Sequence, residues 1–349
     1  MRKPRTSIVG LLALLLLLVT ACGDDDSADA TGADETADET TDGTDEPEEG
    51  ADDEASAADG DAGTIAIITV DPSNPFWAAE VDTAVAEAEA LGYSTTVNAH
   101  NNDPNEQNQF IDSAISAGVD AIILDPAGAE ESVGVVQRAT DAGIPVFLVN
   151  AEIAEQDIAK SQLVSNNAQG ATLGAQEWAE AMGGEGTYVE LLGNPTDNNA
   201  RVRSDAYAEV LAQFPDLELL QQETANWDRV QGKERMDALL SAHPDLDGVV
   251  SGNDEMALGA IESLRDAGRL DDVLVLGFDG NQDAVDAVAA GEMVATVLQP
   301  IVELTAEAVR QADNYLRTGE TGADTEKQAI DCMLITPENA SQVNNFVVS

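Results

Sequence analysis

Two adjacent aromatic residues and an amide stand together in the segment DPSNPFW, which runs from Asp71 to Trp77. The whole chain has only 13 aromatic residues, so a pair of them in a short polar segment is informative. A flat ring can cover the C–H face of a sugar-like ligand, while the amide of Asn74 bonds its hydroxyl groups. The alternative is that Pro75 begins a helix and that the rings of Phe76 and Trp77 enter the core.

Five further polar or aromatic residues lie after expected strands or at the start of an expected helix, namely Asn150, Arg201, Trp227, Asn253 and Asp279. Arg201 lies where the helix dipole disfavours a cation, so we expect a ligand or a carboxylate to hold it there. The amide of Asn253 and the carboxylate of Asp279 can each bind two adjacent hydroxyl groups. For both residues the alternative is helix capping, which is the commonest role of Asn or Asp ahead of a helix.

The elements that must position these residues alternate between apolar, β-branched runs and helical patterns. A first series predicts strands at 64–70, 94–99, 121–124 and 146–149, with helices at 77–91, 105–117 and 129–142. A second series predicts strands at 187–192, 217–222, 248–251 and 273–277, with helices at 199–213, 230–242 and 256–267. Apolar segments at 284–289 and 294–297 and a long helix at 302–316 follow.

Such βα series form parallel sheets with right-handed crossovers, so the predicted fold class is α/β. Because the sequence contains two such series of alternating strands and helices, we expect two similar lobes, each with a parallel sheet flanked by helices. Ligands of open α/β sheets bind beyond the carboxyl ends of the strands. The sequence therefore predicts a binding site between the two lobes, lined by the residues that follow the strands.

The first 62 residues differ from the rest of the chain. Residues 1–22 join a basic start to a run of twelve apolar residues, which is typical of a secretory signal and shorter than the roughly 20 residues of a membrane span. Cys22 follows this run and small residues, as in a bacterial lipobox, in which the cysteine is lipidated. The alternative is an ordinary signal with a chance cysteine.

Residues 23–62 hold 18 acidic and no basic residues, which predicts a disordered acidic tether rather than a calcium-binding or partner-recruiting tail.

Charge and composition exclude several classes of function. A net charge of −52 argues against a nucleic-acid partner, and two cysteines cannot form a disulfide scaffold. A carboxylate pair for glycoside hydrolysis is the enzyme alternative. However, neither His100 nor His243 follows a clear core strand, and the chain lacks a nucleophile elbow, a phosphate-binding glycine loop and the spacing of a calcium loop. We therefore expect no catalysis, no cofactor and no metal site.

The loop motifs together resemble those of the sugar-binding proteins of bacterial ABC importers, in the ribose-binding-like branch of the type I periplasmic binding fold. The resemblance covers nearly all of residues 63–349, and its motifs are SNPFW, AGVDAIIL, AGIPV, GNDEMALGA, LGFDGNQDAV and VATVLQ. By position it implies sugar contacts at Asn74, Phe76, Trp77, Asn150, Arg201, Trp227, Asn253, Asp279 and Gln299. Trp77 and Trp227 are then expected to sandwich the ligand from opposite lobes.

The chain departs from ribose binders in one place. They carry an Asp-Arg pair after the fourth strand, whereas this chain has Asn150 and Ala151. A buried hydroxyl left without its partner costs about 1–3 kcal/mol, which is tenfold or more in affinity. We therefore expect another monosaccharide or a polyol rather than ribose.

The resemblance also implies a hinge of three chain crossings, near 165–167, 299–301 and 331–332. The lobes are then 63–165 with 300–331, and 166–299 with 332–349. We expect ligand to close the lobes and the closed form to meet the permease and ATPase subunits of an importer. The protein is expected to be a monomer, outside the cytoplasm and lipid-anchored to the outer face of the cell membrane or periplasmic. The alternative that the sequence leaves open is a sugar-sensing receptor that serves a membrane sensor kinase, which neighbouring genes would distinguish.

Overall fold

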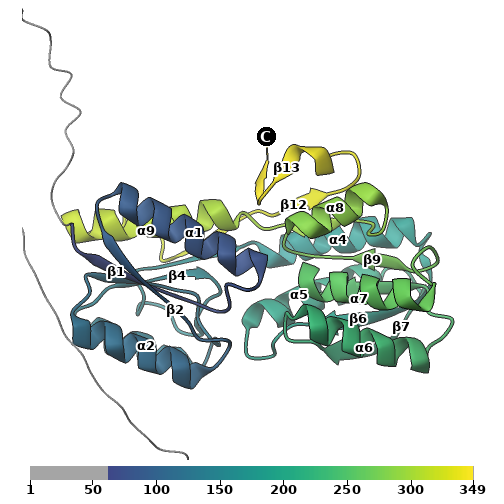
Figure 1. The fold of residues 1–349 in the computed structure, drawn as a ribbon, viewed down its shortest axis with the longest axis horizontal. Coiled ribbons are helices and arrows are strands. Elements are labelled where there is room, and N and C mark those ends of the chain that lie inside the picture. Colours follow the sequence, from purple (N-terminus) through teal and green to yellow (C-terminus); the bar gives the residue numbers. More distant parts are fainter. Residues whose placement is uncertain (1–61, 349) are drawn as a thin grey trace, which may run out of the picture. The chain divides into compact units, whose positions relative to one another are not determined.

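The computed structural model describes residues 62–348 and contains two separate parallel sheets with helices on both faces of each (Figure 1). The α/β class predicted from the sequence is confirmed. The expected signal peptide at 1–22, its Cys22 and the acidic tether up to residue 61 lie outside the described residues.

The first sheet has six strands in the order β11-β5-β4-β3-β1-β2, and every neighbouring pair is parallel. Its strands are β1 (Thr64–Thr69), β2 (Ser94–Ala99), β3 (Ala121–Leu124), β4 (Val146–Asn150), β5 (Ser161–Ser165) and β11 (Lys327–Ile330). Alternate residues of β1 pack into different cores. Ile65 and Ile67 share a hydrophobic cluster with α1 (Pro75–Ala90) and α9 (Ile301–Thr318), while Ala66 and Ile68 share another with α2 (Pro104–Ala117) and α3 (Val133–Asp141). The two-residue period of a strand explains this division, since successive side chains point to opposite faces.

The second sheet has four parallel strands in the order β7-β6-β8-β9. They are β6 (Glu185–Leu192), β7 (Asp216–Thr224), β8 (Gly248–Ser251) and β9 (Leu274–Leu276). Helices α4 (Asn167–Ala181) and α5 (Asn198–Leu211) cover one face, and α6 (Arg229–Ala242) and α7 (Asp254–Ala267) cover the other. Isolated bridges from Leu276 to Ala295 and from Asp279 to Leu298 add β10 (Thr296–Leu298) to this sheet.

The C-terminal elements lie beside β10 and α8 (Gln282–Ala290). β12 (Met333–Ile335) pairs antiparallel with β10, and α8 contacts the short helix η1 (Ala340–Gln342) and strand β13 (Val343–Asn344). β13 in turn forms a hairpin with β14 (Val347–Val348).

Capping residues fix where the helices begin, and hence which side chains lie at the carboxyl edge of each sheet. A side-chain oxygen accepts a first-turn backbone N–H at the starts of six helices, from Asn74, Asp103, Asn166, Asp197, Asp228 and Asn253. In α1 and α2 a proline also occupies the first turn, where its missing N–H costs no hydrogen bond. The chain therefore turns abruptly after each strand and leaves polar side chains at the sheet edge.

Three chain segments run from the first sheet to the second. β5 leads into α4, β10 leads into α9, and β11 leads into β12. Two of the crossings are bonded to each other, since Asn166 donates through its backbone N–H to Ile330 O at 2.7 Å and through its side chain to Asp331 at 2.7 Å. As expected, α9 returns to the first sheet, where it contacts β4 and β5.

Two local expectations were incomplete. The helix predicted at 129–142 begins only at Val133, because the backbone of Ala129 bonds elsewhere: its N–H donates to Thr196 O at 3.1 Å and its carbonyl accepts from Ala154. Helix α4 was not predicted. Its buried stripe consists largely of alanine and glycine around Trp178, which gives a weak apolar period in the sequence.

Candidate functional site

An inner cavity lies between the lobes, beyond the carboxyl ends of the strands, with about 260 Å³ of space free of atoms, which includes open solvent. It is lined by Asn74, Phe76, Trp77, Asn150, Asp197, Asn199, Arg203, Trp227, Asn253, Asp279 and Gln299. The structure thus brings eight of the nine predicted site residues together, and it leaves out Arg201.

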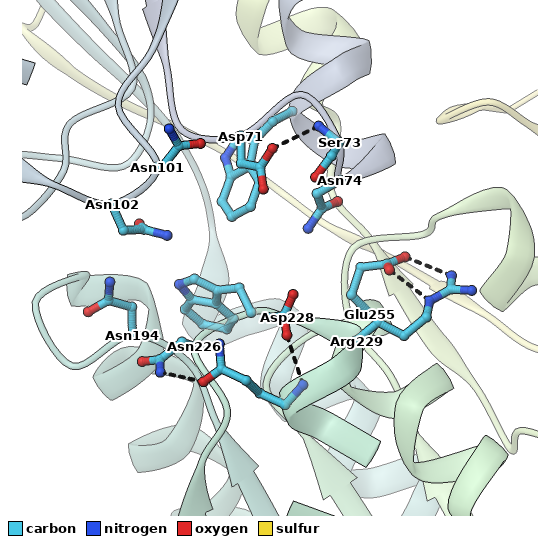
Figure 2. A pocket seen from close by; sticks show the side chains of 13 residues that line it. Asp71, Ser73, Asn74, Asn101, Asn102, Asn194, Asn226, Asp228, Arg229 and Glu255 are labelled. Carbon is cyan, nitrogen blue, oxygen red and sulfur yellow. Dashed lines mark hydrogen bonds and ion pairs between the residues drawn. The ribbon is translucent and has the colours of Figure 1, made fainter. Parts of the chain in front are cut away.

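A larger outer chamber adjoins the inner cavity and shares Asn74, Trp77 and Trp227 with it. The chamber holds about 1080 Å³, part of which is open solvent. Figure 2 shows its two walls, with Asn101 and Asn102 of the first lobe opposite Asn194 and Asn226 of the second. The path into the inner cavity is therefore lined by amides.

The first wall of the inner cavity is built at the start of α1. Asn74 caps the helix by accepting from the N–H of Phe76 at 2.9 Å. The indole N–H of Trp77 donates to Asp125 Oδ2 at 2.9 Å, which fixes the plane of the ring. Phe76 and Trp77 are 3% and 7% exposed and belong to the hydrophobic core, yet both line the cavity. The rings of Phe76 and Trp77 are therefore part of the hydrophobic core and also line the cavity.

Trp227 supplies the opposite wall from a strained backbone. Its φ is 68°, a left-handed conformation that bulky residues rarely adopt, and strain of this kind gathers at binding sites. Two contacts fix the residue: its carbonyl accepts from Asn253 Nδ2 at 3.2 Å, and its ring lies over Gly193. A Cβ at Gly193 would come within 2.0 Å of the ring, so only glycine leaves room for the indole.

Arg203 is the buried cation of the cavity, with 3% of its surface exposed. Its Nε donates to Asn167 Oδ1 at 2.7 Å, and Nη1 donates to Gly252 O at 2.8 Å and to Asp279 Oδ1 at 3.3 Å. The guanidinium also lies 3.8 Å from the ring centroid of Phe278, a cation–π arrangement. These contacts hold the planar group rigid within the inner cavity.

The prediction that Arg201 reaches the site is wrong. Its side chain is 67% exposed, and it bonds Asp205 at 2.9 Å and Asn198 at 2.8 Å. Two residues along a helix rotate a side chain by about 200°, so Arg201 and Arg203 point to nearly opposite sides of α5. A carboxylate, rather than a ligand, holds this cation near the helix N-terminus.

Asp279 and Gln299 form a pair beside Arg203. Gln299 Nε2 donates to Asp279 Oδ1 at 2.7 Å, and Asp279 has an unusual φ of 130°. Burial raises the pKa of the Asp279 carboxyl above its ordinary value, and the neighbouring Arg203 opposes that shift. Helix α8 begins after Asn281, so Asp279 is not its cap.

Two buried carbonyl oxygens of the inner cavity have no hydrogen-bond partner, Asn150 Oδ1 and Gln299 Oε1. A buried oxygen without a hydrogen bond destabilises the folded protein, so these two oxygens suit a ligand that donates hydrogen bonds from O–H groups.

The side-chain oxygen of Asn253, in contrast, already has a hydrogen-bond partner. It accepts from Met256 N at 2.9 Å as the cap of α7, so the capping interpretation is correct for this residue, although it lines the cavity.

Four residues at or behind the cavity were missed by the sequence reasoning: Asp125, Asp197, Asn199 and Arg203. Asp125 directly follows a predicted strand, so the rule that selected Asn150 also selects it. Arg203 lies one turn from Asn199 and from the buried Tyr207, a period that marks the inner side of α5. Asp197 caps that helix, and burial raises its pKa.

Residues 62–348 contain neither a metal-binding cluster nor a membrane-spanning helix. No group of three or more His, Cys, Asp or Glu within that range is arranged to hold a metal ion. The same part of the chain contains no helix with the length and apolar character of a membrane span.

Two parallel-sheet lobes, three crossings and a cavity between the lobes define the chain as a two-lobed binding protein. A family model for the periplasmic binding protein domain matches residues 65–321. The chain belongs to the periplasmic binding protein family, in its ribose-binding-like branch of sugar-binding proteins. The resemblance noted in the sequence is therefore confirmed.

Similar proteins carry names that agree with this family. The D-apiose import binding protein of Actinobacillus succinogenes is 49% identical over 290 residues, 83% of this chain and 93% of the relative. The ribose import binding protein of Escherichia coli is 30% identical over 275 residues, 79% of this chain and 91% of the relative. The Caulobacter myo-inositol binding protein, solved with myo-inositol, superimposes with a TM-score of 0.77 at 26% identity and covers 82% of this chain and 97% of its own.

The family assigns the general role. This chain is the extracytoplasmic substrate-binding protein of an ABC importer, and it interacts with a permease. It is not an enzyme, because proteins of this class bind a substrate for transport and leave it chemically unchanged.

Proposed function

We propose that this protein captures a neutral monosaccharide or small polyol in the inner cavity and delivers it to the permease. One observation carries the proposal: Trp77 and Trp227, from opposite lobes, line the same cavity as the unpaired oxygens of Asn150 and Gln299. Indole faces suit the C–H faces of a sugar, and unpaired carbonyl oxygens suit its hydroxyl groups. The proposed contacts are Asn74, Phe76, Trp77, Asn150, Asn199, Arg203, Trp227, Asn253, Asp279 and Gln299.

Charge narrows the ligand class. The cation of the inner cavity, Arg203, is already paired with Asp279, and Asp197 adds a further acidic group. An anionic sugar would meet these carboxylates without a free cation, so a neutral ligand is favoured.

D-apiose is the first ligand to test, since two proteins named D-apiose import binding proteins are 49% and 48% identical to this chain. Asn150 and Ala151 replace the charged pair of ribose binders, which supports a pentose of different shape from ribose. Xylitol and myo-inositol follow, because similar proteins are named or solved with them.

A thermal-shift screen of pentoses, hexoses and polyols tests the proposal. A ligand at 100 times its dissociation constant adds about 2.7 kcal/mol of stability, which is readily measured. Trp77→Ala and Trp227→Ala should each reduce the shift to about a third or less while the protein stays folded. Trp178→Phe is the matched control, because Trp178 is buried in the second lobe and donates to Leu274 O, away from the cavity. An unreduced shift in both cavity variants would refute the proposal.

Closure of the lobes is proposed as the signal to the permease. Hydrogen bonds already cross between the lobes, from Asn199 Nδ2 to Asn150 O at 3.3 Å and from Asn198 Nδ2 to Glu152 Oε1 at 2.7 Å. A ligand that contacts both lobes adds to these bonds only in the closed state. Small-angle scattering should show a more compact protein with saturating ligand, and equal compactness in both states would contradict this mechanism.

The finer assignments are also proposals. We infer that Cys22 carries a lipid that anchors the protein to the outer face of the cell membrane, and that the mature protein is a monomer. The proposed lobes are 63–165 with 300–331, and 166–299 with 332–349. Cys22→Ser should release the protein from membranes into the soluble fraction, and mass spectrometry of the mature N-terminus measures the lipid directly.

A further inference from the structure

A buried polar cluster lies behind the Trp77 wall, and its centre is Asp125, which is 1% exposed. A single oxygen of this residue, Oδ2, accepts from the indole N–H of Trp77 at 2.9 Å and from Asn150 Nδ2 at 2.8 Å. One carboxylate oxygen therefore sets the position of an aromatic wall and of the Asn150 amide, which lines the inner cavity and whose Oδ1 is buried without a hydrogen-bond partner.

A second acid, Glu80 of α1, lies against Asp125 and is also 1% exposed. Its Oε1 accepts from Thr69 Oγ1 at 2.8 Å, whereas its Oε2 is buried and receives no hydrogen bond, and the two carboxyl groups interact with each other. Two ionised carboxylates can only accept, so their contact becomes a hydrogen bond only when one of them holds a proton. Burial raises the pKa of Asp125 to about 7, and its two N–H donors oppose that shift. Glu80 receives only the Thr69 hydroxyl, so the proton belongs on Glu80.

The groups around this pair supply no opposing positive charge. His100 Nε2 pairs with the backbone carbonyl of Asp125 at 2.8 Å, so that nitrogen carries the hydrogen, and burial lowers the pKa of the imidazole and keeps it neutral. Asp197 of the second lobe adds negative potential at Asp125, and Asp103 and Glu106 face His100. Loss of the proton from Glu80 would thus place two adjacent negative charges in a buried site.

We propose that Asp125 is a positioning residue that holds Trp77 and Asn150 in place for the ligand, and that Glu80 carries a proton which it donates to Asp125. The effect on ligand affinity rests on the proposed function, whereas the bonding of the Trp77 indole does not.

The proposal has a defined pH dependence. Burial raises the pKa of Glu80 well above 4.5, so the proton it holds stabilises the folded protein. That contribution is fully present below the unfolded pKa and is lost as the pH rises through the folded pKa. Glu80→Gln keeps a donor towards Asp125 without a titrating group, so it should remove this loss.

Carbon-13 NMR of the carboxyl carbons tests the proton directly in the wild-type protein. The signal of Glu80, assigned by its disappearance in Glu80→Gln, should have the chemical shift of a protonated acid at pH 7, and the shift of an ionised carboxylate would overturn the proposal. Glu190→Gln is the matched control, because Glu190 is a buried acid of the second lobe that bonds Gln222. It should leave the Glu80 signal unchanged.

Nitrogen-15 NMR tests the positioning role. Asp125→Asn should move the indole N–H resonance of Trp77, assigned through Trp77→Phe, and should weaken binding of D-apiose at least tenfold. An unmoved resonance in folded Asp125→Asn would refute the positioning role. If the wild-type protein binds no sugar, the proposed function fails, but the two NMR measurements still decide this proposal.

Discussion

Residues of the two lobes meet at the inner cavity and also at a surface site formed by Glu152, Asn198 and Arg201, which we call the rim. The two places are built differently. In the cavity Arg203 is 4% exposed at its side chain and makes three hydrogen bonds, one of them to Asp279. At the rim Arg201 is 67% exposed and bonds Asp205, while Asn198 of its helix bonds Glu152 of the first lobe. Two arginines of the same helix thus occupy opposite environments.

The difference shows that burial, rather than residue type, distinguishes an arginine that lines the cavity from one that lies on the surface. Exposed ion pairs contribute about 0–1 kcal/mol because water screens them and their side chains lose entropy. Removing one member of a buried pair is far more destabilising, because the remaining charge is left without a partner. Substitutions in the cavity should therefore have large effects, and those at the rim should have small ones.

The largest effect is expected for Arg203→Ala. Asp279 is then left buried without its cation, which should lower the free energy of unfolding by about 3–5 kcal/mol. Loss of this donor should also weaken ligand binding at least a hundredfold. Urea unfolding and calorimetric titration measure the two effects, and a variant that binds as tightly as the wild type would show that Arg203 has no role in the site.

A smaller but still large loss is expected for Trp227→Ala, which removes one aromatic wall. The apolar contact of a large side chain contributes about 2 kcal/mol, or roughly thirtyfold in affinity. Trp178→Phe serves again as the control. An affinity within twofold of the wild type would show that the ring does not contact the ligand.

Gly193→Ala should produce the next largest effect. The new Cβ would lie 2.0 Å from the Trp227 ring, so the ring must move. Overpacking of this kind costs about 1–3 kcal/mol, and we expect about tenfold weaker binding. Gly134→Ala is a control for glycine substitution as such, because Gly134, like Gly193, has no left-handed φ, and no atom lies within 4 Å of its Cβ position. Equal affinities for both variants would contradict the packing argument.

The smallest effect is expected at the rim. Glu152→Ala removes the hydrogen bond from Asn198, and Arg201→Ala removes an exposed ion pair. Each should change affinity by less than about fivefold, which corresponds to less than about 1 kcal/mol. A loss from Arg201→Ala as large as that from Arg203→Ala would restore Arg201 as a site residue.

Much of the fold was predictable because the strands and capping residues are local signals. Strands 121–124 and 248–251 were predicted to the residue. Helix α4 was missed because small side chains pack its buried face. The choice between Arg201 and Arg203 depends on the phase of α5, which the dipole argument ignored. Asp125 was overlooked although it directly follows strand 121–124, so the rule that selected Asn150 was not applied to every strand.

A crystal structure of the protein with D-apiose, or with the tightest ligand of the screen, tests the central claim most directly. The ligand should lie between Trp77 and Trp227, with hydroxyl groups that donate to Asn150 Oδ1 and Gln299 Oε1. Ligand density outside the inner cavity, or a complex in which either indole does not touch the ligand, would contradict this account.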